Sequence, residues 1–299
     1  MILVCGTVCI DRVRRVTHLP KLGGYVSVQS EELRLGGEAA NTAFALQSWG
    51  AEFQLVGNHS GRRGDSEDWN RLWALLDGTG LSKYVAEPQR HGSAGVPICD
   101  IYITPGGQRT MFGLGFDQLA NGLKAADFDL SHVSWFTIDM NLGQLGRDLV
   151  VRANDQGVQT YLLDFVHEAD PIPKGCIWQS STDWVGKSGD RDANAKVAQN
   201  ICDRFGATAI VTDGEFGTVY AQPGEAIKFC QPYKAGSVVD STGAGDTFRA
   251  AMLRQLFNQV PMDDAVRWAS VAASLKCQYH GATTVQPTIA EIKAGFADY

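Results

Sequence analysis

The residues of this chain best suited to chemistry form a glycine-rich turn with an acid beside it, at positions 239–248 (Val-Asp-Ser-Thr-Gly-Ala-Gly-Asp-Thr-Phe). Gly243 and Gly245 lack side chains, so consecutive backbone N–H groups can converge there on an anion. The pattern predicts that the turn follows an apolar strand and that a helix begins near Asp246, which adds free N–H groups and a positive dipole end. A carboxylate at that point can take a proton from a hydroxyl beside a bound phosphate, as phosphoryl transfer to an alcohol requires.

The same turn has a plainer explanation. Asp246 or Thr242 could serve only as a helix cap that satisfies unpaired N–H groups at the start of the helix. Taken alone, the turn leaves both interpretations open, and the remainder of the chain has to decide between them.

Composition and charge limit the classes of partner. The chain has 299 residues, of which 44% are hydrophobic and 20% charged, as is ordinary for a soluble globular enzyme. Its net charge of −7, without a long basic run, argues against nucleic acid and anionic membranes as partners. The seven cysteines are scattered without a C-x-x-C pair, and neither a signal peptide nor a membrane span is recognisable. We therefore expect a cytoplasmic protein with reduced thiols that acts on a small molecule.

Apolar strands alternate with amphipathic helices along most of the chain. This rhythm predicts an α/β fold, a three-layer and mostly parallel sheet with helices on both faces, in a single domain of residues 1–299. We expect strands at 2–5, 53–56, 135–138, 159–164, 184–185 and 209–212, and helices at 38–49, 68–76, 144–154 and 193–205. Two β excursions, at about 13–35 and at 95–112 with a turn at 105–107, are predicted to form a small β lid.

Several polar or glycine residues lie where the predicted strands end. In parallel α/β folds the ligands bind at the carboxyl ends of the strands. The residues that fall at or near such ends are Asp11, Gly36–Gly37, Asp139, Thr212–Gly214 and Gly243–Asp246.

Two stretches of the chain together resemble the ribokinase-like (PfkB-type) carbohydrate kinase family, and the resemblance covers nearly the whole length. The segment 240–246 is similar to the C-terminal signature of that family, which is highly specific. The segment 36–41 (Gly-Gly-Glu-Ala-Ala-Asn), followed by Gly50 and Gly57, resembles its N-terminal signature, and residues 6–11 resemble the sugar-contacting end of its first strand. Two signatures in the right order favour the catalytic interpretation of the turn over capping alone.

The resemblance implies a role for each residue that matches a family motif. Asp246 would be the general base, and the backbone amides of an anion hole would come from Gly243, Ala244 and Gly245. The acceptor hydroxyls would be held by Asp11, Gly36, Gly37, Asn41 and Asp139, although Asp11 could be an exposed strand-end acid and Asn41 a local cap. ATP would be bound by Lys187, Thr212, Gly214 and Gly217, together with Gly243 and Gly245.

The resemblance also implies metal ions. Mg²⁺ would accompany ATP, with Asp190 in contact through water, and Asp240 and Thr242 could form a site for a monovalent cation such as K⁺ together with the loop at 272–285. Lys187-Ser188-Gly189-Asp190 departs from the Asn-x-x-Glu motif of the family, so Lys187 either touches phosphate or is solvated.

Three further positions depart from the family pattern. Arg249 replaces a small polar residue, and it either reaches a phosphate or an acidic substrate or lies on the helix surface. Glu38 and Cys9 stand where ribokinases tend to have lysine and asparagine, which argues against ribose itself as the acceptor.

Three functions follow from these residues. The first is an ATP-dependent kinase that phosphorylates a hydroxyl of a sugar or sugar-derived small molecule. The second is a nucleoside kinase of the same fold, whose base pocket could use Tyr25, Tyr102, Phe112 or Phe116. The third is a non-catalytic regulator that binds a sugar or a nucleotide. Only the altered metal motif at 187–190 supports it. Because the lids of this family often pair between subunits, we also expect a homodimer.

Overall fold

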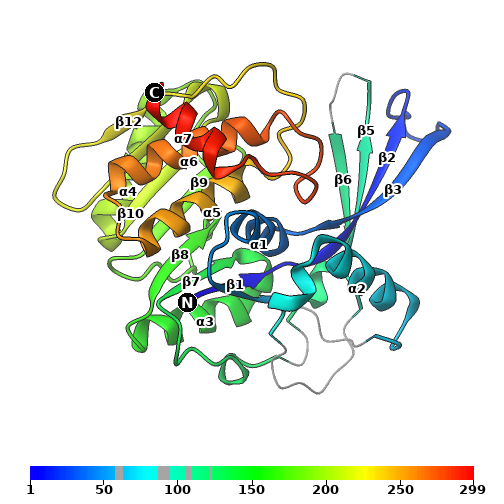
Figure 1. Cartoon of the computed structure of the whole chain (residues 1–299), viewed down its shortest axis with the longest axis horizontal. Helices are drawn as coiled ribbons and strands as arrows, with labels where there is room; N and C mark the ends of the chain where they lie inside the picture. The colour runs from blue at the N-terminus through cyan, green and yellow to red at the C-terminus, as the bar shows by residue number, and fades with distance from the viewer. Residues whose placement is uncertain (58–62, 87–94, 106–108, 121–122) are drawn as a thin grey trace.

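An eight-stranded sheet runs through the centre of the molecule (Figure 1). The structure is a computed structural model, and it describes residues 1–57, 63–86, 95–105, 109–120 and 123–299. The strand order is β12-β11-β10-β9-β8-β7-β1-β4. The six strands from β10 to β4 are parallel, β11 is antiparallel to β10, and β12 is antiparallel to β11. Their bounds are β1 Ile2–Gly6, β4 Phe53–Gly57, β7 Trp135–Asp139, β8 Gln159–Leu163, β9 Ile177–Ser181, β10 Thr208–Thr212, β11 Thr218–Ala221 and β12 Lys228–Cys230.

Helices cover both faces of this sheet, because successive side chains of each strand point to opposite sides. Along β1, Ile2 and Val4 belong to one apolar core, whereas Leu3 and Cys5 belong to the other. The first core is closed by α1 (Glu38–Ser48), α2 (Glu67–Thr79), α5 (Ala244–Phe257), α6 (Met262–Lys276) and α7 (Ile289–Ala297), and the second by α3 (Gly143–Asp155) and α4 (Arg191–Phe205). The predicted three-layer α/β fold is thereby confirmed.

A second, four-stranded sheet projects from the main body (Figure 1). Its order is β3-β2-β5-β6, with β2 and β5 parallel and the two outer pairs antiparallel. The predicted small β element is present, and the turn predicted at 105–107 falls on residues 106 and 107, which lie outside the described residues. The bounds are β2 Cys9–Val16, β3 Val28–Gly36, β5 Ile98–Ile103 and β6 Arg109–Leu114. We refer to it below as the small sheet.

Short 3₁₀ turns connect several of these elements. They lie at Leu81–Tyr84, Phe116–Gln118, Ala125–Asp127, Met140–Leu142 and Gly214–Phe216. No helix in the described ranges is long and apolar enough to cross a bilayer. The seven cysteines, all of which lie in the described ranges, form no disulfide with one another.

The strand predicted at 184–185 is wrong. Trp184 is 61% exposed and lies in a turn, whereas the true strand, β9, ends at Ser181. The apolar pattern expected of a buried strand is interrupted in β9 by two buried polar residues, Gln179 and Ser180. Gln179 accepts a hydrogen bond from the Tyr161 hydroxyl (2.7 Å), and Ser180 donates to Asp164 (2.7 Å). Such polar residues tolerate burial only where partners are present, and partners on other strands cannot be identified from the local sequence.

The apolar strand predicted before the glycine-rich turn is also wrong. Residues 231–243 have no regular structure, and Val238 and Val239 are 71% and 46% exposed. The backbone N–H of Val239 donates to the carbonyl of Cys277 (2.8 Å), just beyond α6, rather than to a neighbouring strand. β-branched residues favour a strand only where they pair with a neighbouring strand, and among the described residues the sheet ends at β12 without including residues 231–243.

Candidate active site

The start of α5 has no side-chain cap, so the capping interpretation of the glycine-rich turn finds no support there. The first residue of α5 follows Gly243, which has a left-handed backbone (φ 77°). The first amides of a helix have no acceptor within the helix. A Cβ built on Gly245 would meet nothing within 4 Å, so an anion has room to approach these amides. The geometry therefore favours an anion site over a cap at this point.

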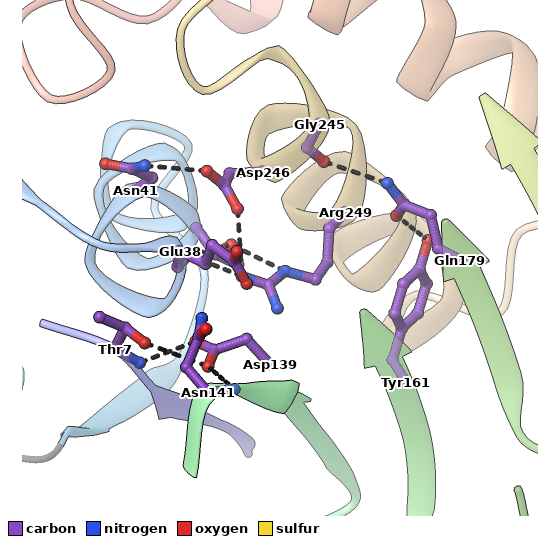
Figure 2. Close-up of polar contacts among 11 residues, drawn as sticks. Thr7, Glu38, Asn41, Asp139, Asn141, Tyr161, Gln179, Gly245, Asp246 and Arg249 are labelled. Carbon is purple, nitrogen blue, oxygen red and sulfur yellow. Dashed lines mark hydrogen bonds and ion pairs between the residues drawn. The ribbon is translucent and has the colours of Figure 1, made fainter. Parts of the chain in front are cut away.

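Asp246 lies in the first turn of α5, between Asn41 and Arg249 (Figure 2). One carboxylate oxygen accepts a hydrogen bond from Asn41 Nδ2 (2.8 Å), and the other faces Arg249 Nη2 at 3.3 Å. The residue is only 7% exposed, and burial raises its pKa to about 6, although Arg249 and Asn41 act in the opposite direction. Asp246 is consequently ionised at neutral pH yet close enough to its pKa to accept a proton.

Arg249 is fully buried, so neither a surface position nor direct contact with a bound phosphate fits this residue. Its Nε donates to Thr42 Oγ1 (2.9 Å), and its Nη2 donates to the Glu38 carbonyl (2.6 Å) as well as facing Asp246. The guanidinium therefore joins the first turns of α1 and α5, as Figure 2 shows. Nη1 is buried and finds no partner among the described residues.

Further acids surround this guanidinium. Burial, together with the nearby carboxylates of Asp139 and Asp246, holds the pKa of Glu38 well above its usual range. Asp139 and Asp164 also face Arg249, and burial raises the pKa of both. One cation therefore lies near several carboxyl groups, and burial together with the neighbouring carboxylates favours the protonated form of Glu38.

Asp139, at the end of β7, has both of its oxygens engaged. The Thr7 amide donates to it at 2.7 Å, and the Thr7 hydroxyl (3.2 Å) and the Asn141 amide (3.1 Å) donate to its other oxygen. The residue has 0% exposure. These contacts fix the turn that follows β1, while the hydroxyl contact that the resemblance implies for Asp139 stays a prediction.

Asp11 lies on β2, and its carboxylate rests over Gly36 of the neighbouring strand β3. A Cβ on Gly36 would overlap this carboxylate, so the glycine is required by close approach. Burial raises the pKa of Asp11 to about 6, opposed by a hydrogen bond from the Cys9 thiol and by Arg34 and Arg109. The carboxylate is thus held at the inner end of the small sheet, as a contact with acceptor hydroxyls would require.

Gly37, which precedes α1, also needs its missing side chain. Its φ is 97°, and a Cβ there would overlap the carbonyl of Thr7. That carbonyl accepts hydrogen bonds from the amides of Ala39 (3.2 Å) and Ala40 (3.4 Å). The end of β1 and the start of α1 are joined in this way, which brings Asn41 to Asp246.

The predicted nucleotide-binding residues follow β10, where Asp213 organises the loops. The carboxylate of Asp213 accepts hydrogen bonds from Thr182 Oγ1 (3.0 Å), the Gly189 amide (2.9 Å) and Asn194 Nδ2 (3.0 Å). Thr212 ends β10, and Gly214 and Gly217 have positive φ values of 48° and 95°. The loops at 182–190 and 212–217 are therefore tied to each other beside the end of the sheet.

Lys187 and Asp190 form an exposed pair at the start of α4, with Nζ and Oδ2 3.4 Å apart. The other oxygen of Asp190 caps α4 by accepting from the Ala193 amide (3.0 Å). In this conformation Asp190 is a helix cap with both oxygens engaged, and no group of three or more possible metal ligands (His, Cys, Asp or Glu) occurs among the described residues.

Asp164 is a candidate that the sequence-based list of site residues omits. It follows β8 with a left-handed backbone (φ 57°), accepts a hydrogen bond from Ser180, and has its pKa raised to about 6 by burial, with Asp139 and Asp183 adding to the rise. The signal was available, because Asp164 is an acid at the end of a predicted strand. Positive φ in a residue other than glycine often accompanies a functional site.

Comparison with known proteins agrees with this geometry. Residues 181–289 match the model of the pfkB family carbohydrate kinases. An uncharacterized sugar kinase of Dictyostelium discoideum is 27% identical, with 97% of this chain and 96% of that protein covered. The chain is thus similar to the PfkB-type carbohydrate kinases over residues 181–289, and its full-length homologue is a sugar kinase. Such homologues are phosphotransferases with an alcohol group as acceptor.

Solved structures share the ribokinase-like fold. Ribokinase of Arabidopsis thaliana, complexed with ribose and ATP, superposes with a TM-score of 0.79 at 19% identity, covering 99% of this chain and 98% of that one. The nucleoside kinase of Burkholderia thailandensis, in complex with inosine, gives 0.72 at 20% identity, covering 100% and 96%. At such identities the likeness shows the fold of this chain and leaves its acceptor open.

The raised pKa of Asp246 predicts a pH dependence. With Asp246 as the general base that the family resemblance implies, kcat/KM should fall below an apparent pKa of about 6, because the protonated carboxyl cannot accept a proton. The measurement is kcat/KM for the acceptor between pH 4.5 and 8. An acidic limb near pH 4, the ordinary range of an exposed aspartate, would contradict the burial argument.

Removing the buried cation should move this limb. In Arg249→Met, Asp246 loses an opposite charge, so the acidic limb of kcat/KM should shift to higher pH by about one unit or more. Arg71→Met is the matched control, because Arg71 also pairs with acids one turn earlier on its helix, Glu67 and Asp68, but on the surface. An unchanged limb in a folded Arg249→Met would show that Arg249 does not act on the base.

Proposed function

We propose that this chain is an ATP-dependent kinase that transfers the γ-phosphate to a hydroxyl of a sugar or sugar-derived small molecule. The observation that carries the proposal is a buried carboxylate, Asp246, at the uncapped start of α5, hydrogen-bonded to Asn41 of the N-terminal signature. A base and an anion site thus adjoin each other, which is the arrangement that phosphoryl transfer to an alcohol needs.

In the proposed reaction Asp246 takes the proton of the acceptor hydroxyl. The hydroxyl oxygen forms a bond to the γ-phosphorus of ATP as the bond from that phosphorus to the β–γ bridging oxygen breaks, and ADP leaves. The amides of Gly243, Gly245 and Asp246 stabilise the charge on the phosphoryl oxygens during this transfer, whereas the amide of Ala244 donates to the carbonyl of Ser241 (3.1 Å) and would have to turn to do so. Asp11, Gly36, Gly37 and Asn41 hold the other hydroxyls of the acceptor, so the reacting hydroxyl is held in line.

The nucleotide would lie along the loops that follow β9 and β10, with Thr212, Gly214 and Gly217 beside it. Lys187 would exchange its ion pair with Asp190 for a contact with a phosphate. Lys187 supports this role by its exposure, since its side chain is 73% accessible. When bound, Mg²⁺ supplies positive charge that partly neutralises the phosphates.

For Mg²⁺ we favour Asp164 over Asp190. Both oxygens of Asp190 are engaged by Ala193 and Lys187, whereas one hydrogen bond, from Ser180, is found for Asp164 in the described part of the chain. Asp164 also interacts electrostatically with Asp183, so two carboxylates lie near each other at the ends of β8 and β9. Carboxylate oxygens are the protein ligands that Mg²⁺ prefers.

The small sheet gives less support to a nucleoside as the acceptor. Tyr102 and Phe112 contact each other edge to face, with ring centroids 5.9 Å apart. The strand register places Tyr102 beside Arg14 and Phe112 beside Asp100, whereas Asp11 pairs with Cys99 on the opposite face. Of the aromatic residues considered for a base pocket, these two therefore lie on the wrong face to meet an acceptor held by Asp11.

We also propose a homodimer formed through the small sheet, in the cytoplasm. Apolar side chains that are 38–65% exposed on β3 and β6 support the dimer, namely Leu33, Met111, Phe112 and Leu114. Seven cysteines without a disulfide among them are compatible with a reducing compartment.

Replacement of the base should separate chemistry from binding. In Asp246→Asn, kcat should fall at least about 10²-fold while the Kd for ATP·Mg²⁺ stays within a few-fold, because the amide cannot accept the proton but keeps the size of the side chain. Activity is measured as ADP release with a panel of ketoses, aldoses, sugar acids, sugar phosphates and nucleosides. Asp192→Asn, an exposed acid in the first turn of α4, is the matched control. Near-normal turnover in Asp246→Asn would remove this residue from the role.

Loss of the acceptor contact should have a different kinetic signature. In Asp11→Ala, KM for the acceptor should rise at least about tenfold, because a charged hydrogen-bond partner for its hydroxyls is lost, whereas KM for ATP should change little. Steady-state kinetics with each substrate varied in turn gives both constants. An equal rise in both would indicate that Asp11 supports the fold of the small sheet instead.

A further inference from the structure

The residues that would form a monovalent-cation site in this family do not fit a metal ion in this chain. We propose that the ammonium group of Lys276 occupies that role permanently, so that the enzyme works without K⁺. For its effect on turnover the inference rests on the proposed kinase function, whereas its structural part does not.

Asp240 is the acid to which the resemblance assigns the cation. One of its oxygens accepts a hydrogen bond from the Thr242 amide (2.9 Å), and the other accepts from the Gly281 amide (2.8 Å). The carboxylate thereby ties the glycine-rich turn to the loop that follows α6. The backbone amide of Asp240 also donates to the carbonyl of Cys277 (3.1 Å), the residue that follows Lys276. These contacts hold Asp240 beside the end of α6.

Lys276 supplies that cation. It is the last residue of α6, has 0% exposure, and its Nζ donates to the carbonyl of Tyr279 at 3.4 Å. A lysine is almost never fully buried unless a counter-charge accompanies it. Burial lowers the pKa of Lys276, and the Asp240 carboxylate opposes this shift by favouring the charged ammonium. An anionic carboxylate and a backbone carbonyl are the kinds of oxygen that a bound monovalent cation would need, and the lysine already interacts with both.

Two arginines of the small sheet add positive charge to the same loops. Arg109 donates to Thr242 Oγ1, and Arg34 lies against Gly281, where a Cβ would overlap its guanidinium. Both arginines disfavour the charged form of Lys276 by repulsion. A further cation bound here would meet three positive charges around one acid, so K⁺ binding is opposed by repulsion as well as by the ammonium group.

A positive charge at Asp240 affects the amides that are proposed to bind phosphate. Gly243 packs against Ala282, next to Gly281 in the loop that Asp240 holds. Charge placed at Asp240 therefore stabilises the backbone that presents the amides of Gly243, Ala244 and Gly245. A tethered ammonium does this at any salt composition, whereas an exchangeable ion would do so only when bound.

The test compares cations at constant ionic strength. Wild-type kcat should differ less than twofold between chlorides of K⁺, Na⁺ and tetramethylammonium, and the thermal midpoint should be equally insensitive. Lys276→Ala should lose at least about tenfold in kcat in tetramethylammonium chloride, because an acid is left without its buried partner. K⁺ or methylammonium should restore a substantial part of that loss and raise the midpoint. Lys293→Ala, an exposed lysine on α7, is the matched control.

Other results overturn the proposal. Activation of the wild type by K⁺ of about tenfold or more would show that a metal site coexists with Lys276. A folded Lys276→Ala with unchanged kcat in every salt would show that the ammonium is dispensable. Lys276→Met, which keeps the volume without the charge, should lose activity that no salt restores, and restoration by K⁺ would count against the proposal. If no acceptor is turned over by the wild type, the proposed function fails, while the salt dependence of the thermal midpoints still decides the role of Lys276.

Discussion

The active-site region depends on one buried ionic contact, that between the Arg249 guanidinium and the Asp246 carboxylate. The same guanidinium holds α1 through Thr42 and the Glu38 carbonyl, so the two signature segments of the chain meet around a single cation. Removing one partner of a buried ion pair typically costs about 3–5 kcal/mol, because the other charge is left uncompensated. Asp246 therefore contributes to stability as well as being the proposed base. Arg249 affects both the position and the pKa of Asp246.

The remaining elements bring two kinds of chemistry to this point. The open start of α5 has amides and a positive dipole end available to an anion, while the small sheet carries Asp11 and contacts the turn before α5 through Arg109 and Thr242. Glycines at positions 36 and 37 allow the carboxylate of Asp11 and the carbonyl of Thr7 to approach the backbone closely. Three further carboxylates each fix a loop by accepting a hydrogen bond from a backbone amide. Asp139 accepts from Thr7, Asp213 from Gly189, and Asp240 from Gly281. Carboxylates thus do structural work around a site in which one of them is the proposed base.

Local patterns in the sequence were sufficient for the fold class, the small sheet and the residues of both signatures. They failed where a residue depends on distant partners. The sequence left a surface position possible for Arg249, because helix periodicity does not reveal that α1 packs against that side of α5. Lys276 carried no signal at all, since its burial depends on Asp240, 36 positions earlier in the chain. The strand β9 was misplaced because Gln179 and Ser180 are polar, and their partners, Tyr161 and Asp164, lie on or next to the neighbouring strand.

The most direct test of the proposed mechanism is a crystal structure of the ternary complex with a non-hydrolysable ATP analogue and the acceptor that the activity panel identifies. The account predicts that the γ-phosphate contacts the amides of Gly245 and Asp246, and that one acceptor hydroxyl lies within hydrogen-bond distance of the Asp246 carboxylate, with Asp11 bound to other hydroxyls. A γ-phosphate bound away from the start of α5, with Asp246 in contact only with Asn41 and Arg249, would contradict it.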